Sequence, residues 1–230
     1  MKITNFNYGI QIEEKNVIIF FGNRFSSRSV LTDLFPYNFS ELKQVHGDEL
    51  VVLNHSKFRN SSELPIADAQ TTSTKNLALL IKTADCMPIF IFDDSFEKIL
   101  AIHAGWRGIA NEITTKSINK VFSNSLNLNI VIGPHIKQES FEVDQDVKNQ
   151  ILNTVSPQER PLCYSESSKS GKYLIDLQAV LLLNLRNHFK KINFIITDLS
   201  SNTVTNSNLN SYRRDPKNLN RNFSFIVLAG

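Results

Sequence analysis

The sequence predicts a mixed α/β or α+β fold, and two observations along the chain lead to this class. Short apolar runs rich in β-branched and aromatic residues recur over the whole length, each bounded by polar or turn residues, as is typical of buried strands. Segments with apolar residues at helical spacing lie between these runs. Because no break in composition divides the chain, we expect a single domain over residues 1–230.

The apolar runs and the helical segments can be placed along the chain. Strands are predicted at residues 17–21, 77–81, 88–92, 99–102, 130–132, 194–196 and 223–228. Helices are predicted at residues 109–122, 144–155 and 176–189. In the last helix Leu177, Val180, Leu181 and Leu185 share one face, and Asp176 is the expected N-cap. Surface loops are predicted at residues 55–64, 165–172 and 200–210.

Composition and charge exclude several classes of protein. Hydrophobic residues make up 41% of the chain and charged residues 20%, which can fill a sizeable core and is not the composition of a disordered protein. The net charge of +3 is weak and dispersed, so we expect no nucleic-acid partner. The run 17–21 is far too short to cross a bilayer, and the chain begins with no signal peptide. We therefore expect a cytoplasmic protein without a membrane partner, and the sequence leaves its oligomeric state open.

Three segments place metal-binding side chains beside predicted strands. They carry His46, Cys86 and His103, and the last of these is followed by a glycine at position 105. A residue at the end of a strand is held rigidly and can still face open space. Two imidazoles and one thiolate suit zinc, whose catalytic sites use three protein ligands and leave a fourth position open. Zinc is therefore the predicted cofactor.

The same residues support other interpretations. Each of the three could be a buried or hydrogen-bonded structural residue, since free cysteine is often buried. Cys86 could also be a thiolate nucleophile with His103 as its base, which would make the protein a cysteine hydrolase or transferase. His46 favours the metal site over this pair, because a cysteine–histidine pair needs no second histidine. A copper oxidase of phenols is the least favoured, since the chain has only five histidines and no His-x-His pair.

At these segments the chain resembles a known family. The resemblance rests on Thr83-Ala84-Asp85-Cys86-Met87-Pro88 and His103-Ala104-Gly105-Trp106-Arg107-Gly108, with further matches at Lys43-Gln44-Val45-His46-Gly47, Ala67-Asp68-Ala69, Ile132-Gly133-Pro134-His135-Ile136, Phe141-Glu142-Val143 and Ser211-Tyr212-Arg213-Arg214-Asp215. These segments are similar to those of the YfiH-like family, also called laccase-domain or polyphenol oxidase proteins, whose members are described as purine nucleoside phosphorylases.

The resemblance implies a function and a fold. It implies a metal site on His46, Cys86 and His103, phosphorolysis of adenosine, inosine or related nucleosides with phosphate, and adenosine deamination as a second activity. The implied fold is a sandwich of mixed sheets with flanking helices, similar to the catalytic domain of the cytotoxic necrotizing factor toxins. Those toxins use a cysteine and a histidine, so a hydrolase or amidase acting on peptidoglycan precursors stays open as the alternative.

The chain departs from the family pattern in places. The usual glycine-rich segment after an arginine appears as Arg24-Phe25-Ser26-Ser27-Arg28-Ser29, without its glycines. Lys137 replaces a usual glycine, and the family's terminal Gly-Arg appears as Asn220-Arg221. None of these departures touches the three proposed ligands.

Roles for further residues follow from the implied chemistry. Phosphate is best held by the guanidinium fork of arginine, and the candidates are Arg107, Arg213, Arg24 and Arg214. Arg107 could instead form an ion pair with Asp85 or Asp68.

Carboxylates and uncharged side chains complete the set of candidates. Asp68 and Asp85 are candidates for orienting a ligand histidine or for proton transfer. Gln44 would share a strand face with His46 and could bind a base or hydroxyl group. Trp106 and Tyr212 could stack on a purine, although an aromatic residue at a turn more often packs in the core. His135 could be a polar group at the pocket or a surface residue, and Cys163 receives no function.

Overall fold

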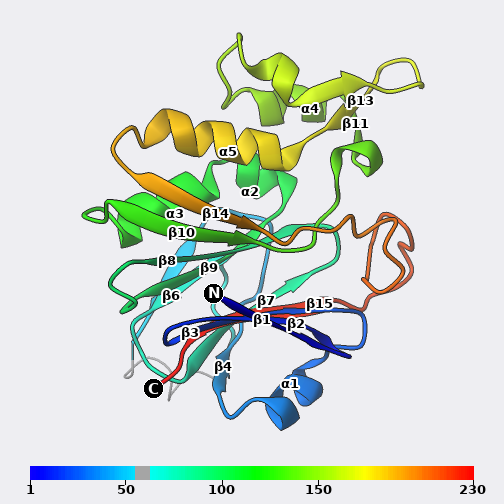
Figure 1. The fold of residues 1–230 in the computed structure, drawn as a ribbon. Helices are drawn as coiled ribbons and strands as arrows, with labels where there is room; N and C mark the ends of the chain where they lie inside the picture. Colours follow the sequence, from blue (N-terminus) through cyan, green and yellow to red (C-terminus); the bar gives the residue numbers. More distant parts are fainter. Residues whose placement is uncertain (55–62) are drawn as a thin grey trace.

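Two six-stranded sheets form the centre of the molecule in the computed structural model, which describes residues 1–54 and 63–230 (Figure 1). The order in the first sheet is β1 (Lys2–Phe6), β2 (Gly9–Glu14), β3 (Val17–Gly22), β15 (Asn222–Leu228), β7 (Leu77–Thr83) and β4 (Asn38–Ser40). The order in the second sheet is β14 (Asn193–Asp198), β10 (Asn127–Ile132), β8 (Met87–Asp93), β9 (Ile99–Ala104), β6 (Ala69–Thr72) and β5 (Leu50–Leu53). Both sheets are mixed, because β4 with β7, β10 with β14 and β5 with β6 are parallel pairs. The predicted α+β class with mixed sheets is confirmed.

The sheets pack face to face because their central strands are apolar on both faces. In β7, Leu79 and Ile81 enter the core between the sheets, whereas Leu80 points to the opposite face. In β8, Phe90 enters the same inter-sheet core and Ile89 faces outward. Successive side chains of a strand point to opposite faces, so a continuous apolar run is required wherever both faces are buried. This explains why the sequence shows unbroken apolar runs rather than alternation.

Helices cover the outer faces of both sheets (Figure 1). Helix α1 (Arg28–Leu34) lies on the first sheet, and α2 (Trp106–Ala110), α3 (Ile113–Val121) and α5 (Leu177–His188) lie on the second. The predicted N-cap of α5 is confirmed, because the side chain of Asp176 accepts a hydrogen bond from the backbone N–H of Ala179. Helix α4 (Gln145–Leu152) packs beside a small sheet of β11 (Glu142–Asp144), β13 (Lys172–Ile175) and β12 (Tyr164–Glu166). Within the described residues, no helix is long and apolar enough to cross a membrane.

The single helix predicted at residues 109–122 is wrong, because the structure contains two helices there. Helix α2 ends at Ala110 and α3 begins at Ile113. Between them Glu112 has a φ of 57°, a left-handed conformation that a right-handed helix cannot continue. Both helices pack on β9 and α5, and α2 also packs on α4.

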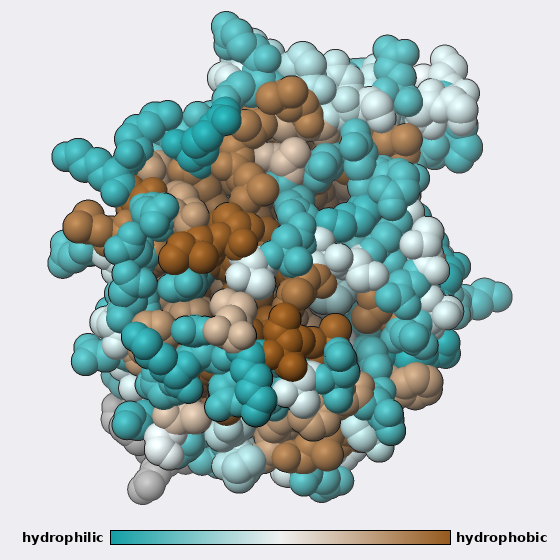
Figure 2. All heavy atoms as spheres, in the orientation of Figure 1, coloured by the Kyte–Doolittle hydropathy of each residue, from teal (hydrophilic) through white to brown (hydrophobic). Residues whose placement is uncertain are grey.

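The buried strand predicted at residues 194–196 is also wrong in its burial. Strand β14 is the edge of the second sheet, and Ile195 and Ile196 are 46% and 37% exposed. Figure 2 shows apolar surface over β14 and near the start of β1. The predicted loop 165–172 begins within β12, the loop 200–210 is irregular as expected, and most of the loop 55–64 lies outside the described residues.

The crossings between the two sheets place chemically active residues at one end of the sandwich. The chain passes from β7 of the first sheet to β8 of the second through residues 84–86. Strand β9 runs antiparallel to β8, so its last residues lie beside the start of β8. The chain between β4 and β5 makes a second crossing from one sheet to the other and carries His46. Segments far apart in sequence therefore meet at this end.

Candidate functional site

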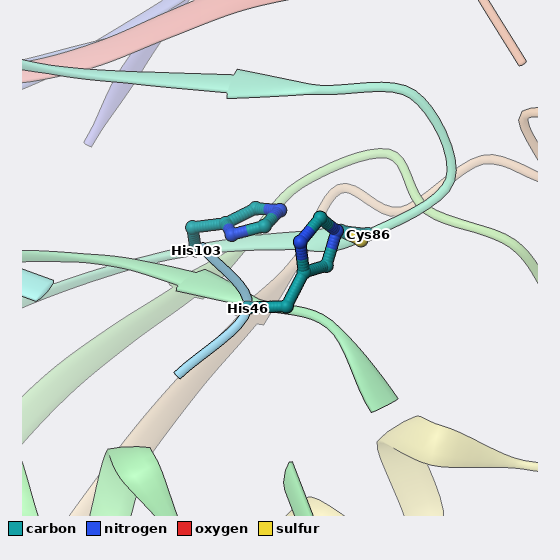
Figure 3. A group of neighbouring side chains, drawn as sticks. All are labelled: His46, Cys86 and His103. Carbon is teal, nitrogen blue, oxygen red and sulfur yellow. The ribbon is translucent and has the colours of Figure 1, made fainter. Parts of the chain in front are cut away.

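His46, Cys86 and His103 lie together at this end of the sandwich. One donor atom from each side chain lies within 4.8 Å of the others, and Figure 3 shows the two imidazole rings and the sulfur grouped together. The rings of His46 and His103 meet edge to face with centroids 4.9 Å apart. His103 is buried, Cys86 is half-buried and His46 is exposed, so the group is anchored on one side and open on the other.

Backbone geometry fixes the positions of the three side chains. Pairing of β8 with β9 places Pro88 opposite His103, which brings Cys86 beside the end of β9. His46 has a φ of 61°, and Asp85, directly before Cys86, has a φ of 89°. Residues other than glycine rarely adopt such conformations, and they persist only where surrounding contacts hold them. Two of the three donors therefore lie on or beside strained backbone.

The carboxylate of Asp68 supplies the contacts that hold His46. Asp68 is fully buried, and its oxygens accept hydrogen bonds from the backbone N–H groups of Val45 at 3.1 Å, His46 at 3.0 Å and Gly47 at 2.7 Å. It also bonds Nδ1 of His103 at 2.7 Å. Burial opposes the charge on Asp68, but the hydrogen bond with His103 and those from the backbone lower the pKa of this carboxyl. An ionised Asp68 keeps one proton of His103 on Nδ1, so Nε2 is the ring nitrogen that could bind a metal after it loses its own proton.

Gly105 leaves the space that the three side chains occupy. A Cβ atom at this position would lie 3.0 Å from Cδ2 of His46 and 3.1 Å from Sγ of Cys86. Both distances are tighter than ordinary contacts, so any larger residue would push the donors apart. A side chain at position 105 would therefore make His46 and Cys86 shift from the positions that group them with His103.

The thiol of Cys86 and the imidazole of His103 shift each other's ionisation. Burial raises the pKa of Cys86, but the charge and hydrogen bond of His103, together with those of His46, lower it to about 6. Burial lowers the pKa of His103, but Cys86 and Asp68 raise it to about 9. At neutral pH the pair is therefore a thiolate beside an imidazolium, and a thiolate is the form that binds metals or attacks carbon.

The chemistry of the three donors fits a zinc-type ion. Two imidazoles and one thiolate are the kind of set found at catalytic zinc sites, and their spacing leaves room for one ion between them. The bond from Asp68 to His103 is the outer contact that ligand histidines commonly make. Among the described residues this is the one group of histidine, cysteine or carboxylate side chains that could hold a metal ion.

A pocket of about 750 Å³ opens beside the three donors. Its walls combine basic, aromatic and aliphatic side chains with a single carboxylate, that of Asp85. The basic residues are Lys43, Lys82, Arg107, Arg213 and Arg221, and the aromatic ones are Trp106, Phe141 and Tyr212. Such walls suit a ligand that has both a flat apolar part and a negative charge.

The four candidate arginines fall in different places. Arg107 and Arg213 line the pocket, whereas Arg24 lies outside its lining and donates to the carbonyl of Ser207 at 3.1 Å. Arg214 donates to four backbone carbonyls of residues 203–209, which makes it a structural clamp on this loop.

Among the described residues, no carboxylate pairs with the guanidinium group of Arg107 or Arg213. The guanidinium of Arg107 lies 4.4 Å from the ring centre of Trp106, and no ion pair with Asp68 or Asp85 is present among the described residues. Arg213 donates to the carbonyl of Glu142 at 3.0 Å. Both guanidinium groups are therefore held beside the pocket by neutral partners and keep their positive charge for a ligand.

Gln44 and Asp85 line the pocket but already have protein partners. The amide of Gln44 exchanges hydrogen bonds with the backbone N–H and C=O of Lys82, at 2.9 and 2.8 Å. Its segment is not a strand beyond an isolated bridge at Lys43, so the shared strand face expected for Gln44 and His46 is wrong. The carboxylate of Asp85 accepts from the hydroxyl of Thr203 at 2.5 Å and the N–H of Arg213 at 2.7 Å, which ties the loop of Arg213 to the Cys86 turn.

The remaining candidates divide between the pocket and the core. Trp106 and Tyr212 line the pocket. His135 is buried outside it, bonds the carbonyl of Gly133 through Nδ1, and has its pKa lowered by burial to about 4. Burial raises the pKa of Cys163 to about 11, with Asp176 and Glu159 adding to the shift, so this thiol is inert core.

Among the basic and aromatic residues of the pocket, reasoning from the sequence gave no role to Lys43, Lys82, Arg221 and Phe141. Lys82 lies four positions before Cys86 on the same strand-to-turn segment, and this proximity could have signalled it. Arg221 stands in the place of the family's terminal arginine but follows Asn220 rather than glycine. Phe141 belongs to the Phe141-Glu142-Val143 segment of the family resemblance, which could have signalled it, and it directly follows a short 3-10 helix at Gln138–Ser140.

Known proteins resemble this chain over most of its length. A purine nucleoside phosphorylase of Rickettsia conorii is 31% identical over 182 residues, which are 79% of this chain and 72% of that protein. A purine nucleoside phosphorylase of Clostridium acetobutylicum is 31% identical over 194 residues, covering 81% and 75% of the two chains. The purine nucleoside phosphorylase YfiH of Escherichia coli is 27% identical over 187 residues, or 81% of this chain and 72% of YfiH.

Solved structures share the fold, and a family model spans the chain. A crystal structure of a Neisseria meningitidis protein matches with a TM-score of 0.85 at 24% identity, over 97% of this chain and 100% of that one. YlmD from Geobacillus stearothermophilus matches with a TM-score of 0.84 at 19% identity, over 99% of both. The model described as multi-copper polyphenol oxidoreductase laccase matches residues 4–229. The chain therefore belongs to this YfiH-like laccase-domain family.

Proposed function

We propose that this protein is a zinc-dependent purine nucleoside phosphorylase acting on adenosine, inosine and related nucleosides. The observation that carries the proposal is the group of His46, Cys86 and His103 beside a pocket with cationic and aromatic walls. The relatives named purine nucleoside phosphorylase, at about 30% identity, support the same activity.

Each donor of the group has a defined part. His103 offers Nε2 because Asp68 holds its Nδ1 proton, and Cys86 offers a thiolate because its pKa is about 6. His46 is turned toward both by the hydrogen bonds of its segment to Asp68. Zinc bound by these donors would supply a Lewis acid that polarises an oxygen or ring nitrogen of the substrate.

Phosphorolysis requires a phosphate oxygen to bond to the anomeric carbon of the sugar while the bond to the purine nitrogen breaks. Arg107 and Arg213 border the pocket from the α2 turn and from the 211–215 segment, and their guanidinium groups match phosphate oxygens in geometry. A flat purine fits between Trp106, Phe141 and Tyr212, since aromatic faces pack well on a heterocyclic ring. Arg24 is not part of the pocket lining and donates to the carbonyl of Ser207, so it is left out of this role.

Deamination of adenosine is proposed as a side activity of the same pocket. It uses water in place of phosphate and does not require the arginines. Loss of Arg107 or Arg213 would therefore reduce phosphorolysis more than deamination.

The first experiment measures metal content and products together. Elemental analysis of the purified protein should give about one zinc per chain, the stoichiometry of a three-ligand site, and His46→Ala should lose it. Adenosine should release adenine only when phosphate is present. Lys120→Ala, which changes an exposed lysine on α3 outside the pocket lining, is the control and should keep both properties. Release of adenine by protein freed of metal would refute the zinc mechanism.

A cysteine-nucleophile hydrolase or amidase is the second candidate, and a specific observation favours it. The thiolate of Cys86, the imidazole of His103 and the carboxylate of Asp68 form a linked series in which the acid orients the base. In this case the Cys86 sulfur would attack a carbonyl carbon, and metal removal would leave the activity intact. Trapping a covalent adduct on Cys86 from an amide substrate, with full activity in metal-free protein, would establish this alternative.

We also place the protein in the cytoplasm. Both cysteines are free thiols, which is typical of a reducing compartment.

A further inference from the structure

Four of the five basic residues of the pocket form two pairs on different parts of the fold, and the fifth, Lys43, lies on the chain between β4 and β5. Arg107 and Arg213 extend from the α2 turn and from the 211–215 segment. Lys82 and Arg221 belong to the first sheet, where Lys82 is on β7 and Arg221 directly precedes β15. Lys82 and Arg221 have no role in the phosphorolysis proposed above.

Strand pairing places Lys82 and Arg221 close to each other. Phe223 of β15 pairs with Lys82 and Asn222 pairs with Thr83. Arg221 directly precedes β15, so the pairing brings it next to the end of β7, where Lys82 lies. Both side chains are half-buried rather than free in solvent, and both line the pocket.

The charges of this pair are only partly compensated. Lys82 bonds Glu41 at 3.2 Å, but that carboxylate is shared with Arg28 at 3.0 Å. Nη1 of Arg221 donates hydrogen bonds to the backbone carbonyls of Leu219 and Asn220. Arg221 forms no ion pair among the described residues. Neighbouring like charges repel each other, so an anion between them would stabilise the arrangement.

We propose that Lys82 and Arg221 form an anion subsite that binds a phosphate group. The position of the subsite is inferred from the charges of Lys82 and Arg221. That the anion is a phosphate group rests on the proposed function. Phosphate chemistry can come from two sources, namely inorganic phosphate as the co-substrate or the phosphate of a nucleoside monophosphate whose base lies nearer the metal ligands. Lys82 and Arg221 line the same pocket as His46, Cys86 and His103, so an anion bound there would share the pocket with the donor group.

The test is isothermal titration calorimetry of the full chain at fixed ionic strength, with inorganic phosphate, adenosine monophosphate and adenosine as separate ligands. Lys82→Ala and Arg221→Ala should each weaken binding of at least one phosphate-bearing ligand by about tenfold, the factor for a lost hydrogen bond to a charged group. Lys82→Arg should retain binding, because it keeps the charge. Lys120→Ala is the matched control and should bind as the unchanged protein does.

The three ligands separate the possible results. Weakening for inorganic phosphate identifies a co-substrate site, and weakening for adenosine monophosphate alone identifies a nucleotide site. If both variants bind both phosphate ligands as the unchanged protein does, or if adenosine binding falls equally, the subsite is refuted.

Failure of the proposed function gives a different result. In that case phosphate binding would depend on Lys82 and Arg221 while adenine release would not depend on phosphate. Conversely, phosphate-dependent turnover together with unchanged binding of both inorganic phosphate and adenosine monophosphate in both variants would refute the subsite alone.

Discussion

Asp68 and His103 are joined by a hydrogen bond of 2.7 Å between a carboxylate oxygen and Nδ1, and the same oxygen accepts the backbone N–H of His46 at 3.0 Å. One buried side chain therefore positions both histidines of the donor group. It acts on His103 through the ring and on His46 through the backbone, which is held at a φ of 61°.

Replacing Asp68 with asparagine should weaken metal binding while leaving the fold in place. Asparagine has nearly the same shape, but it lacks the negative charge and offers only one acceptor oxygen to four donors. We expect zinc affinity to fall by about 10- to 100-fold, the usual cost of losing such a contact to a ligand histidine. Competition with a chromogenic chelator measures the change. Asp146→Asn, an exposed position on α4, is the control, and equal affinities for the two variants would contradict this role of Asp68.

Replacing Gly105 with alanine should disturb the donors by steric contact alone. The added Cβ would lie about 3 Å from both His46 and Cys86, so the two side chains must separate. We expect bound metal to decrease in the purified protein while the circular dichroism spectrum stays unchanged. The same substitution at Gly47 meets its nearest atom at 3.5 Å, an ordinary contact, and should keep its metal. If Gly105→Ala retains full metal content, the space at this glycine is not required.

The thiol of Cys86 should react with iodoacetamide in metal-free protein with a midpoint near pH 6. A lowered pKa means that the reactive thiolate is present above this pH and is lost as the pH falls below it. Burial keeps Cys163 protonated up to a pKa of about 11, so mass spectrometry should find one labelled cysteine at neutral pH. Cys86→Ser should abolish labelling, and bound zinc should protect the thiol. A midpoint near the ordinary thiol value of 9.0 would show that His103 does not stabilise the thiolate.

Replacing the adjacent residues Arg213 and Arg214 with alanine should affect different properties, namely phosphate binding for Arg213 and stability for Arg214. Arg214 donates to four backbone carbonyls of one loop, so Arg214→Ala should lower the free energy of unfolding by about 1–3 kcal/mol. Arg213→Ala should leave stability nearly unchanged and raise the KM for phosphate about tenfold, because its guanidinium faces the pocket. Thermal unfolding and steady-state kinetics on both variants check this. Equal losses of stability would show that Arg213 is also a structural residue.

The sequence predicted which residues could bind a metal better than it predicted where the strands lie in the sheets. The donors His46, Cys86 and His103 were selected because their residue types bind zinc and because each lies beside a predicted strand. The apolar runs predicted the central strands because both faces of those strands are buried. The run at residues 194–196 gave no sign of being at an edge, since an apolar run does not reveal how many neighbours a strand has.

Tertiary structure decided how each candidate is used. Arg24, Arg107, Arg213 and Arg214 are the same residue type, and only their positions separate two pocket residues from a loop clamp and a remote surface contact. Lys82 and Arg221 are 139 positions apart and become neighbours only through the pairing of β7 with β15. The sequence by itself determined which atoms can bind a metal or an anion, because that property belongs to the side chain. Which of them share one pocket depends on pairings between distant strands, which no local pattern encodes.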